Sequence, residues 1–370
     1  MAIERHIYPG GNPPKGVFSY YSYILGQREA NKIVCIKGGP GVGKSSFIRK
    51  IGNDFLAEGE NVDFMHCSSD ADSLDGIVLK DRKIAFIDAT SPHIVDPISP
   101  GAVDDIIHLG EYWDEKGIRK NRLAVIEKGE TISKWYARAY NYLSAAEKLY
   151  DNAAAVYSEA VESAEIYKIA AEIVGKELSH KEICLRPGNI KKYFASAITP
   201  SGFVNYLPSI AEGCKKIYLI SAPFGASAHS ILDIFAEGAV YRGFAVEEYF
   251  CPLKPDSKME HLVVPELSLA FITANEYHDV EPWQLPEGTE SIELLDMDDM
   301  ANASVIERRK KLLDESQNLC DMMMKKAIEC IEEAKKEHDV LESYYIPNMD
   351  FKKIDELRDE IIAKIRSQEV

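Results

Sequence analysis

The segment Gly38-Gly-Pro-Gly-Val-Gly-Lys-Ser45 matches the pattern G-x-x-x-x-G-K-[ST] of a phosphate-binding loop. Residues 32–37 before it form a short apolar run that is typical of a buried strand. After it, apolar residues recur at helical spacing through residues 46–57. A strand, a glycine-rich loop and a helix in this order place backbone N–H groups and a helix N-terminus around a polyphosphate. The segment therefore predicts a binding site for a nucleoside triphosphate.

The residues of this loop have distinct expected roles. Its glycines allow positive φ angles and a close approach of the backbone to phosphate. Lys44 is expected to act in catalysis by reaching the β- and γ-phosphates, and the hydroxyl of Ser45 is expected to bind Mg²⁺. The predicted nucleotide-binding residues lie in the loop or at the start of the helix: Gly38, Gly39, Gly41, Val42, Gly43, Lys44, Ser45 and Ser46.

A carboxylate is expected to complete the metal site. Residues 83–88 form an apolar run that ends in Asp88, a position from which an aspartate holds Mg²⁺ directly or through water. We therefore expect Asp88 to act in catalysis and, together with Ser45, to hold the metal. The sequence contains no [NT]-K-x-D segment for guanine recognition, which favours ATP over GTP. The expected cofactors are ATP and Mg²⁺.

Composition limits where the chain acts and what it binds. It has 370 residues, 46% hydrophobic and 28% charged, as in globular proteins of two or three domains. A net charge of −17 disfavours broad binding to nucleic acid or to anionic membranes. No apolar run is long enough to span a bilayer, the first residues show no signal-peptide pattern, and the seven cysteines include no C-x-x-C pair. These features predict a cytoplasmic protein without a metal cluster.

Some polar residues outside the loop have more than one interpretation. The acidic segment 67–75, expected to be a loop, could bring Asp70 or Asp75 near the γ-phosphate to position water, act as a base or bind an acceptor hydroxyl. The same segment could equally be a solvated turn. His93 is better explained as a structural histidine, and Glu127 could orient a water molecule. We keep Asp70 as a candidate catalytic residue.

A long helical arm is expected after a short strand at residues 123–126. Residues 131–174 contain neither Gly nor Pro, and apolar residues alternate in steps of four and three with alanine at one of the two core positions. The expected core positions are Trp135, Ala139, Tyr142, Ala146, Leu149, Ala153, Val156 and Ala160. Small residues let a second helix approach closely, so we expect the arm to contact a protein partner, its own copy or itself as a hairpin.

The chain is a tandem duplication with its join near residues 186–189. The segment 33–45, which includes the loop, matches residues 217–229, and the segment 84–90 matches residues 269–275.

The arm recurs in the second copy. Residues 301–345 again lack Gly and Pro, a break follows at Pro347, and an amphipathic helix is expected over residues 351–365. By analogy, the first arm is expected to divide into a long and a shorter helix near residues 151–162.

The two copies separate what the fold needs from what the chemistry needs. The apolar strand cores survive in the second copy, whereas the residues expected to hold Mg-triphosphate are replaced. Gly38 becomes Ala222, Gly43 becomes Ser227, Lys44 becomes Ala228, Ser45 becomes His229 and Asp88 becomes Thr273. His93 recurs as His278, but Asp70 and Asp75 find no counterpart in the sequence match. The comparison predicts one nucleotide site in each chain.

On these residues the chain resembles the P-loop NTPase superfamily. Its wider pattern is similar to a family of uncharacterised bacterial ATP-binding proteins, found largely in Firmicutes, with a degenerate second copy. The pattern comprises Pro14-Lys-Gly, His66-Cys-Ser-Ser-Asp, Ser73-Leu-Asp-Gly and Ile87-Asp-Ala-Thr-Ser-Pro-His-Ile-Val-Asp-Pro97. The resemblance covers essentially the whole chain. It implies a parallel-sheet P-loop fold and cytoplasmic ATP binding, and it indicates no substrate.

The sequence thus predicts an α/β protein of two tandem P-loop NTPase-like domains, 1–185 and 186–370, with mainly parallel sheets. Each domain carries a coiled-coil-like helical appendage, at about residues 131–175 and 301–365. The first is expected to be a Mg-dependent ATPase, and the second a nucleotide-incompetent partner or regulatory half. Two alternatives stay open: a small-molecule or nucleoside kinase, and a non-enzymatic ATP sensor or scaffold.

Overall fold

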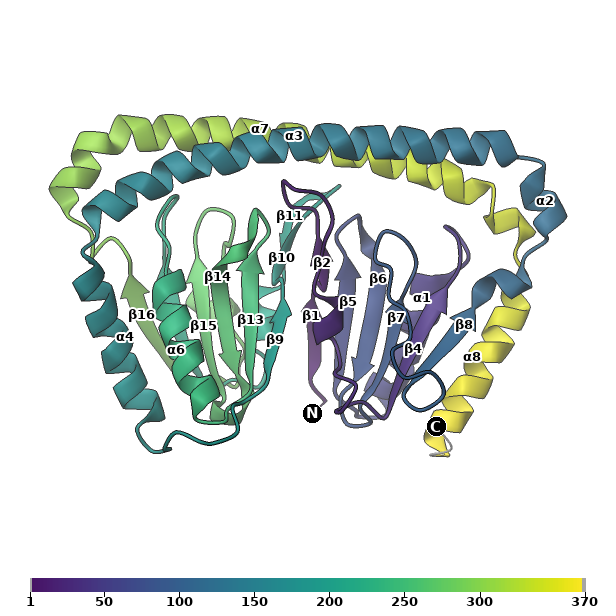
Figure 1. Cartoon of the computed structure of the whole chain (residues 1–370), viewed down its shortest axis with the longest axis horizontal. Helices are drawn as coiled ribbons and strands as arrows, with labels where there is room; N and C mark the ends of the chain where they lie inside the picture. The colour runs from purple at the N-terminus through teal and green to yellow at the C-terminus, as the bar shows by residue number, and fades with distance from the viewer. Residues whose placement is uncertain (1, 368–370) are drawn as a thin grey trace.

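Two six-stranded sheets stand side by side beneath a pair of long helices (Figure 1). This computed structural model describes residues 2–367. The first sheet, in spatial order, contains β1 (Glu4–Ile7), β5 (Val62–Cys67), β6 (Asp70–Leu79), β7 (Ile84–Asp88), β4 (Lys32–Lys37) and β8 (Asp104–His108). The second contains β9 (Ile190–Tyr193), β13 (Val246–Cys251), β14 (Lys254–Val264), β15 (Leu269–Ala274), β12 (Lys216–Ser221) and β16 (Ser291–Asp296). Each strand has a counterpart at the same place in the other sheet, so the topology agrees with an internal duplication.

Each sheet is mainly parallel, as predicted, with one antiparallel strand. In the first sheet β6 runs against its neighbours β5 and β7, and in the second β14 does the same. The prediction of a loop over residues 67–75 was wrong, because Asp70–Asp75 form the first half of β6. Residues 70–73 are mostly polar and are partly or fully exposed, while the residues from Leu74 onward are buried. The strand was missed because its acidic first residues do not show the apolar pattern by which strands are recognised.

One helix in each repeat follows the loop strand and covers its sheet. In the first repeat α1 (Lys44–Ala57) buries Phe47, Ile48, Ile51 and Phe55 against the sheet. In the second, α6 (His229–Tyr241) has the same place. The shorter elements are α2 (Glu115–Arg119), α5 (Leu207–Ile210), and the two-stranded pairs β2 (Gly10–Gly11) with β3 (Phe18–Ser19) and β10 (Ser196–Thr199) with β11 (Gly202–Asn205).

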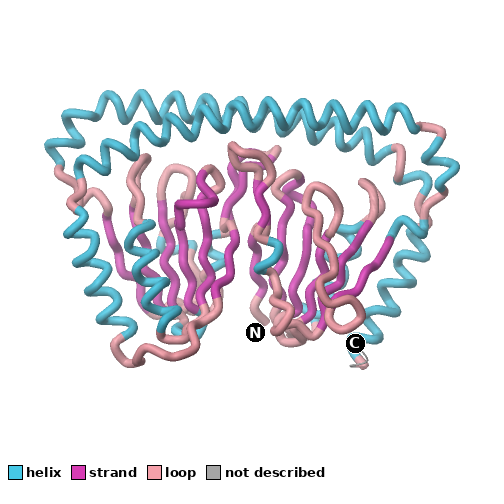
Figure 2. Tube along the Cα trace, in the orientation of Figure 1, coloured by secondary structure: helices cyan, strands magenta, loops and turns pink. Residues whose placement is uncertain are grey.

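The long helices exchange between the two repeats (Figure 2). Helix α3 (Arg122–Ala160) leaves the first repeat and runs antiparallel to α7 (Ala303–Ser343), which leaves the second. Helix α4 (Ser163–Leu178) then packs on α6 of the second repeat, and α8 (Phe351–Arg366) packs on α1 of the first. Each arm therefore begins on its own repeat and ends on the other.

The boundaries of the first arm differ from the expectation at one end. Residues 123–126 were predicted to be a strand, but they form the first turn of α3. A four-residue apolar run does not distinguish a strand from a helix, which explains the error. The predicted division of this arm is confirmed, since α3 ends at Ala160 and α4 begins at Ser163. The predicted helix after Pro347 is also confirmed as α8.

The contact between α3 and α7 is built from small side chains. Ala139, Ala146, Ala153 and Ala160 of α3 and Cys320, Ala327, Ala334 and Leu341 of α7 recur every seven residues, and all are buried. Cys320 Sγ lies 3.6 Å from the carbonyl oxygen of Ala146. The prediction for the other core position of the heptad, which larger residues were expected to fill, was partly wrong. Tyr142 is exposed, while Leu143, Tyr150 and Tyr157 are buried instead. The buried face of α3 differs from the predicted one because α3 packs on the second repeat as well as on α7.

The two sheets meet at their inner edges, near the centre of the molecule. Tyr8, just after β1, and Phe194, just after β9, exchange two backbone hydrogen bonds of 2.9 Å. The rings of Tyr8 and Phe194 are fully buried at this boundary. None of the helices formed by residues 2–367 combines the length and the apolar character that a membrane crossing requires.

Candidate functional site

The glycine-rich loop connects the end of β4 to the start of α1. Its backbone requires glycine at two positions, because Gly41 and Gly43 have φ angles of +68° and +90°. The side chain of Val42 points into the core and is fully buried, so only its backbone is available to a ligand. The loop leads directly into the N-terminus of α1, and the free N–H groups at a helix N-terminus can stabilise an anion.

Lys44, the first residue of α1, folds back over the loop. Its ammonium group donates hydrogen bonds to the carbonyl oxygens of Gly38 at 3.0 Å and Gly39 at 2.8 Å. It also lies 3.6 Å from Oδ2 of Asp88. Asp88 ends β7, which lies directly beside β4 in the sheet. The structure thus brings together the lysine and the carboxylate that the sequence separates by more than forty residues.

The oxygen atoms around Lys44 are held in place by backbone contacts. Oγ of Ser45 accepts a hydrogen bond from the N–H of Leu74 at 2.9 Å, and Oδ1 of Asp88 accepts one from Thr90 at 2.9 Å. Thr90 in turn donates to the carbonyl oxygen of Gly38 at 3.1 Å. Hydroxyl and carboxylate oxygens are the ligands that Mg²⁺ prefers, so Ser45 and Asp88 are suited to hold it. Sequence reasoning missed Thr90, although its position two residues after a strand-end aspartate is typical of an Asx turn.

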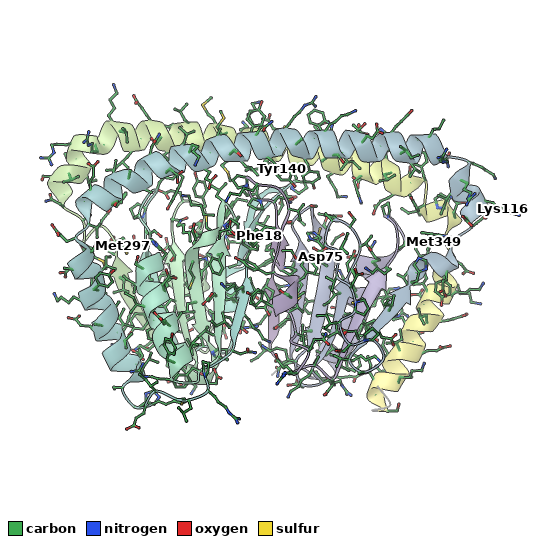
Figure 3. All side chains as sticks on the ribbon, in the orientation of Figure 1. Phe18, Asp75, Lys116, Tyr140, Met297 and Met349 are labelled. Atoms are coloured by element: carbon green, nitrogen blue, oxygen red, sulfur yellow. The ribbon has the colours of Figure 1, made fainter. Side chains whose placement is uncertain are left out.

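A buried acid–histidine pair lies beside the loop site, because Gly76 of β6 is opposite Ile87 of β7 and Asp75 is therefore opposite Asp88. Oδ2 of Asp75, labelled in Figure 3, is 3.9 Å from Nε2 of His93, and the ring of Tyr21 stacks on His93 with centroids 4.9 Å apart. Burial raises the pKa of the Asp75 carboxyl above its usual value, against the opposing effect of His93. The pair therefore has the composition of a proton carrier, and its counterpart in the second repeat decides between that role and a structural one.

The structural counterpart of Asp75 differs from the result of the sequence match. Gly76 lies opposite Ile87 in the first sheet and His261 opposite Ile272 in the second, so Asp75 is equivalent to Glu260 one residue before His261. The sequence match missed this pairing because the β13–β14 hairpin holds one residue more than the β5–β6 hairpin. Glu260 Oε2 lies 3.5 Å from Nε2 of His278. The acid–histidine pair is present in both repeats, although the second repeat lacks the loop residues of the first. The pair therefore has a structural role before any catalytic one.

Asp70 and Glu127 have surroundings that do not include Lys44. Asp70 begins β6, where its carboxylate accepts a hydrogen bond from the hydroxyl of Ser73 at 2.9 Å and lies 3.3 Å from Nζ of Lys335 in α7. Its contacts make it a link between the first repeat and the arm of the second. Glu127 lies in α3 with an exposed side chain.

Aromatic residues cover the outer surface of the loop. A Cβ atom built on Gly39 would lie 3.0 Å from the ring of Tyr345 and 3.6 Å from that of Trp113, and one on Gly43 would lie 3.3 Å from the ring of Phe351. Tyr345 and Phe351 belong to the arm of the second repeat. No sequence pattern identifies them, because they lie some three hundred residues from the loop.

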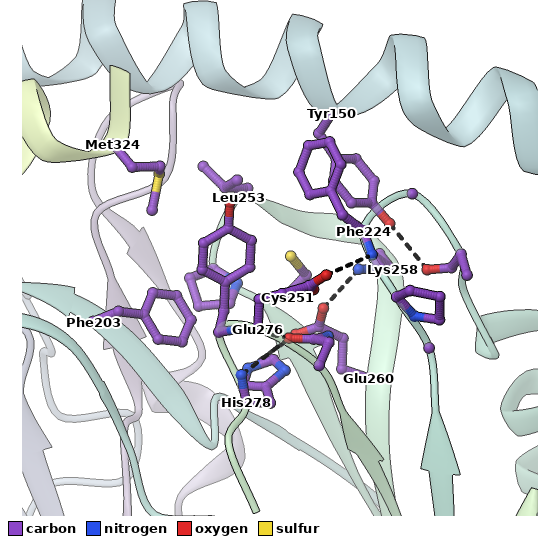
Figure 4. A pocket seen from close by; sticks show the side chains of 17 residues that line it. Tyr150, Phe203, Phe224, Cys251, Leu253, Lys258, Glu260, Glu276, His278 and Met324 are labelled. Atoms are coloured by element: carbon purple, nitrogen blue, oxygen red, sulfur yellow. Dashed lines mark hydrogen bonds and ion pairs between the residues drawn. The ribbon is translucent and has the colours of Figure 1, made fainter. Parts of the chain in front are cut away.

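The corresponding loop of the second repeat lines a small, mostly apolar cavity (Figure 4). Tyr150 enters this cavity from α3, Met324 comes from α7, and Phe224 comes from the loop itself. The ammonium group of Lys258 donates to Oε1 of Glu260 at 2.7 Å and lies 4.6 Å from the ring centroid of Tyr150. The ammonium charge of Lys258 in this cavity is therefore already paired with a carboxylate.

Glu260, His261 and His278 form a cluster with the composition of a metal site. One ligand atom from each lies within 4.8 Å of the others, and all three residues are buried. However, Nδ1 of His261 accepts a hydrogen bond from the N–H of Thr273 at 3.0 Å, so in the neutral ring Nε2 carries the proton. A metal needs a lone pair at that nitrogen. The nearby ammonium of Lys258 further opposes a cation, and the cluster does not fit a metal ion.

The same contacts explain the ionisation of this cluster. Burial, together with the nearby ring of His278, lowers the pKa of His261 well below its usual value. Burial opposes the charge on Glu260, but Lys258 and the neighbouring His278 and His261 together outweigh it and lower the pKa of that carboxyl to about 2. The second repeat therefore holds a closed Lys258–Glu260 ion pair beside neutral histidines.

Comparison of the chain with protein-family models, with curated proteins and with solved structures finds no match. The geometry of the chain's own residues is therefore what indicates a function.

Proposed function

We propose that the first repeat binds Mg-ATP at residues 38–46 and hydrolyses it, and that the second repeat is a regulatory partner that binds no nucleotide. The observation that supports this most directly is the convergence of Lys44, Ser45 and Asp88 beside a loop with two positive-φ glycines. Loop N–H groups and an ammonium group offer the charge complement of a polyphosphate.

Each residue has a stated task in this proposal. Lys44 would exchange its bonds to Gly38 and Gly39 for phosphate oxygens, which are stronger acceptors for an ammonium group than neutral carbonyls. Ser45 and Asp88 would hold Mg²⁺, which neutralises charge that develops on the phosphates during transfer. Asp88 also lies close enough to Lys44 to fix its direction.

The second repeat supports the division of labour. At the positions of Lys44, Ser45 and Asp88 it has Ala228, His229 and Thr273, and its equivalent loop is closed by α3. A Cβ atom on Gly225, the counterpart of Gly41, would lie 2.7 Å from the backbone of Ala153. Helix α3 therefore packs directly on that loop at Gly225.

The test combines binding with turnover. Titration calorimetry with Mg-ATP and measurement of phosphate release should both give a signal for the wild-type chain, and Lys44→Ala should reduce phosphate release to background. Lys50→Ala is a matched control, because Lys50 is on the same helix but is half exposed and pairs with Asp355 of α8. Equal phosphate release from wild type and Lys44→Ala would refute hydrolysis at this loop. Adding a pool of metabolites with labelled ATP separates transfer to water from transfer to an acceptor.

A further inference from the structure

The outer face of the loop in the first repeat is in contact with a carboxylate from the second repeat. Oε1 of Glu342, in the last turn of α7, accepts a hydrogen bond from the backbone N–H of Gly41 at 3.0 Å. A Cβ atom built on Gly41 would lie 3.0 Å from Ile346 and 3.1 Å from the carbonyl oxygen of Glu342. The end of α7 and the turn after it thus lie directly against the loop.

The carboxylate occupies a place where an anion is favoured. Glycine-rich loops at a helix N-terminus attract negative charge because several N–H groups point outward. Glu342 supplies that charge from within the chain. A phosphate group at the same N–H would lie within a few ångströms of the carboxylate, and two anions so close repel each other strongly. Glu342 and a phosphate cannot both be bound to Gly41.

The two repeats close their loops by different chemistry. Over the second loop, Ala153 of α3 packs its backbone and methyl group against Gly225. Over the first loop, the contact with Gly41 is a single hydrogen bond to a charged side chain and an apolar residue at a helix end. The contact of α7 with Gly41 therefore includes a charged group that a stronger anion can replace, whereas the contact of α3 with Gly225 does not.

The helix end is held near the loop by contacts that do not involve the loop itself. Nζ of Lys335 lies 3.3 Å from Asp70 of β6, and Lys128 of α3 forms an ion pair with Glu337. Beyond the turn, α8 packs on α1 through Ile354, Ile362 and Ile365. These contacts leave the end of α7 and the start of its connection to α8 between two anchored parts of the arm. We call this segment, residues 342–346, the strap.

We propose that the strap is a self-inhibitory element: in the nucleotide-free chain Glu342 fills the anion position of the loop, and the phosphates of the nucleotide must displace it. This inference rests on the proposed function. It gives the second repeat a defined role, because its arm reports occupancy of the first repeat's loop through α7. Displacement of Glu342 would change both the α7–α3 contact and the position of the start of α8.

The first experiment measures affinity for Mg-ATP and for tripolyphosphate, which carries the phosphate chemistry without a base. Glu342→Gln removes the charge with little change in shape, so both ligands should bind roughly tenfold more tightly than to wild type. Glu333→Gln is the control, because Glu333 is on the same helix and pairs with Lys336 in solvent; its affinities should equal those of wild type. Thermal unfolding of each variant verifies that the fold is unchanged.

The second experiment fixes the strap in place. Trp113 and Met349 form an antiparallel bridge, a geometry that brings Cα atoms within reach of a disulfide. In the double variant Trp113→Cys/Met349→Cys, oxidation should weaken tripolyphosphate binding at least tenfold, and a reductant should restore it. The reduced form of the same protein is its own control.

The possible outcomes distinguish failure of the strap proposal from failure of the proposed nucleotide binding. If neither wild type nor Glu342→Gln binds Mg-ATP or tripolyphosphate, the proposed function is refuted and the strap with it. If both bind equally tightly, or if oxidation of the double variant changes nothing, nucleotide binding stands and the strap alone is refuted.

Discussion

Arg5 and Glu247 are joined by two hydrogen bonds, of 2.8 and 3.1 Å, across the boundary between the two sheets. The same guanidinium makes two more, of 2.8 and 3.0 Å, to Asp63. Asp63 lies in β5 and Glu247 in β13, which are equivalent strands. One arginine of the first repeat thus holds equivalent carboxylates of both repeats, and all three side chains are buried.

We predict that Arg5→Met destabilises the chain by about 3–5 kcal/mol, since it leaves two buried carboxylates without their partner. Urea unfolding with an unchanged m-value measures the loss. Lys15→Met is the control: Lys15 also reaches across to the second repeat, to Asp256 at 3.5 Å, but both groups are exposed. It should change stability by less than about 1 kcal/mol. Equal effects of the two substitutions would contradict a structural role for the buried triad.

Much of the fold could be predicted from the sequence, because its strands and long helices have clear local patterns of apolar residues. The apolar runs at 32–37 and 83–88 are strands β4 and β7, and the seven-residue spacing of alanine is the contact between α3 and α7. The internal repeat also predicted that a second sheet exists. Strand β6 was missed because its first residues are polar, and the start of α3 was read as a strand because four residues do not reveal a period.

The exchange of the arms was outside what the sequence could predict. A small-residue seam indicates that a helix has a close partner, but it does not say which copy supplies it. For the same reason Glu342 and Tyr345 were not connected with the loop, although they contact it. The residues of the loop itself were found from their spacing, since β4 and α1 are adjacent in the chain.

Acid should destabilise the chain through His66. Burial lowers the pKa of His66 to about 3, and His6, with Nδ1 2.8 Å from its Nε2, adds to the effect. The unfolded value is about 6.5, so between these pH values the unfolded chain binds more protons. Stability is therefore fully present above about pH 6.5 and falls as the pH decreases, by up to about 1.4 kcal/mol per pH unit from this group.

Urea midpoints between pH 7 and pH 5 check this prediction, and His66→Gln should reduce the slope because glutamine does not titrate. The exposed His180 provides the control, since His180→Gln should leave the slope unchanged. A His66→Gln variant with the wild-type slope would show that His66 does not govern the acid response.

Two glycine substitutions should have opposite effects. Gly225 has a φ of +95° and its added methyl group would lie 2.7 Å from Ala153 of α3, so Gly225→Ala should cost about 1–3 kcal/mol. Gly129 is inside α3, where an added Cβ atom would meet nothing within 4 Å beyond the backbone of its own helix, and Gly129→Ala should stabilise by about 0.5–1 kcal/mol. Thermal unfolding distinguishes the two, and the same sign for both would contradict the close packing of α3 on the second loop.

Asp88→Asn should separate metal-dependent turnover from nucleotide binding. The asparagine keeps the oxygen that accepts the hydrogen bond from Thr90 at 2.9 Å, so the turn after β7 is preserved. It removes the charge that lies 3.6 Å from Lys44 and that would hold Mg²⁺ with Ser45. Phosphate release should therefore fall roughly 100-fold, while the affinity for ATP measured in a chelator should stay the same. Asp96→Asn is the matched control, because Asp96 is an exposed carboxylate that pairs with Lys37 at 3.0 Å. If Asp88→Asn releases phosphate at the wild-type rate, or if Asp96→Asn lowers the rate as much, the metal is not held by Asp88.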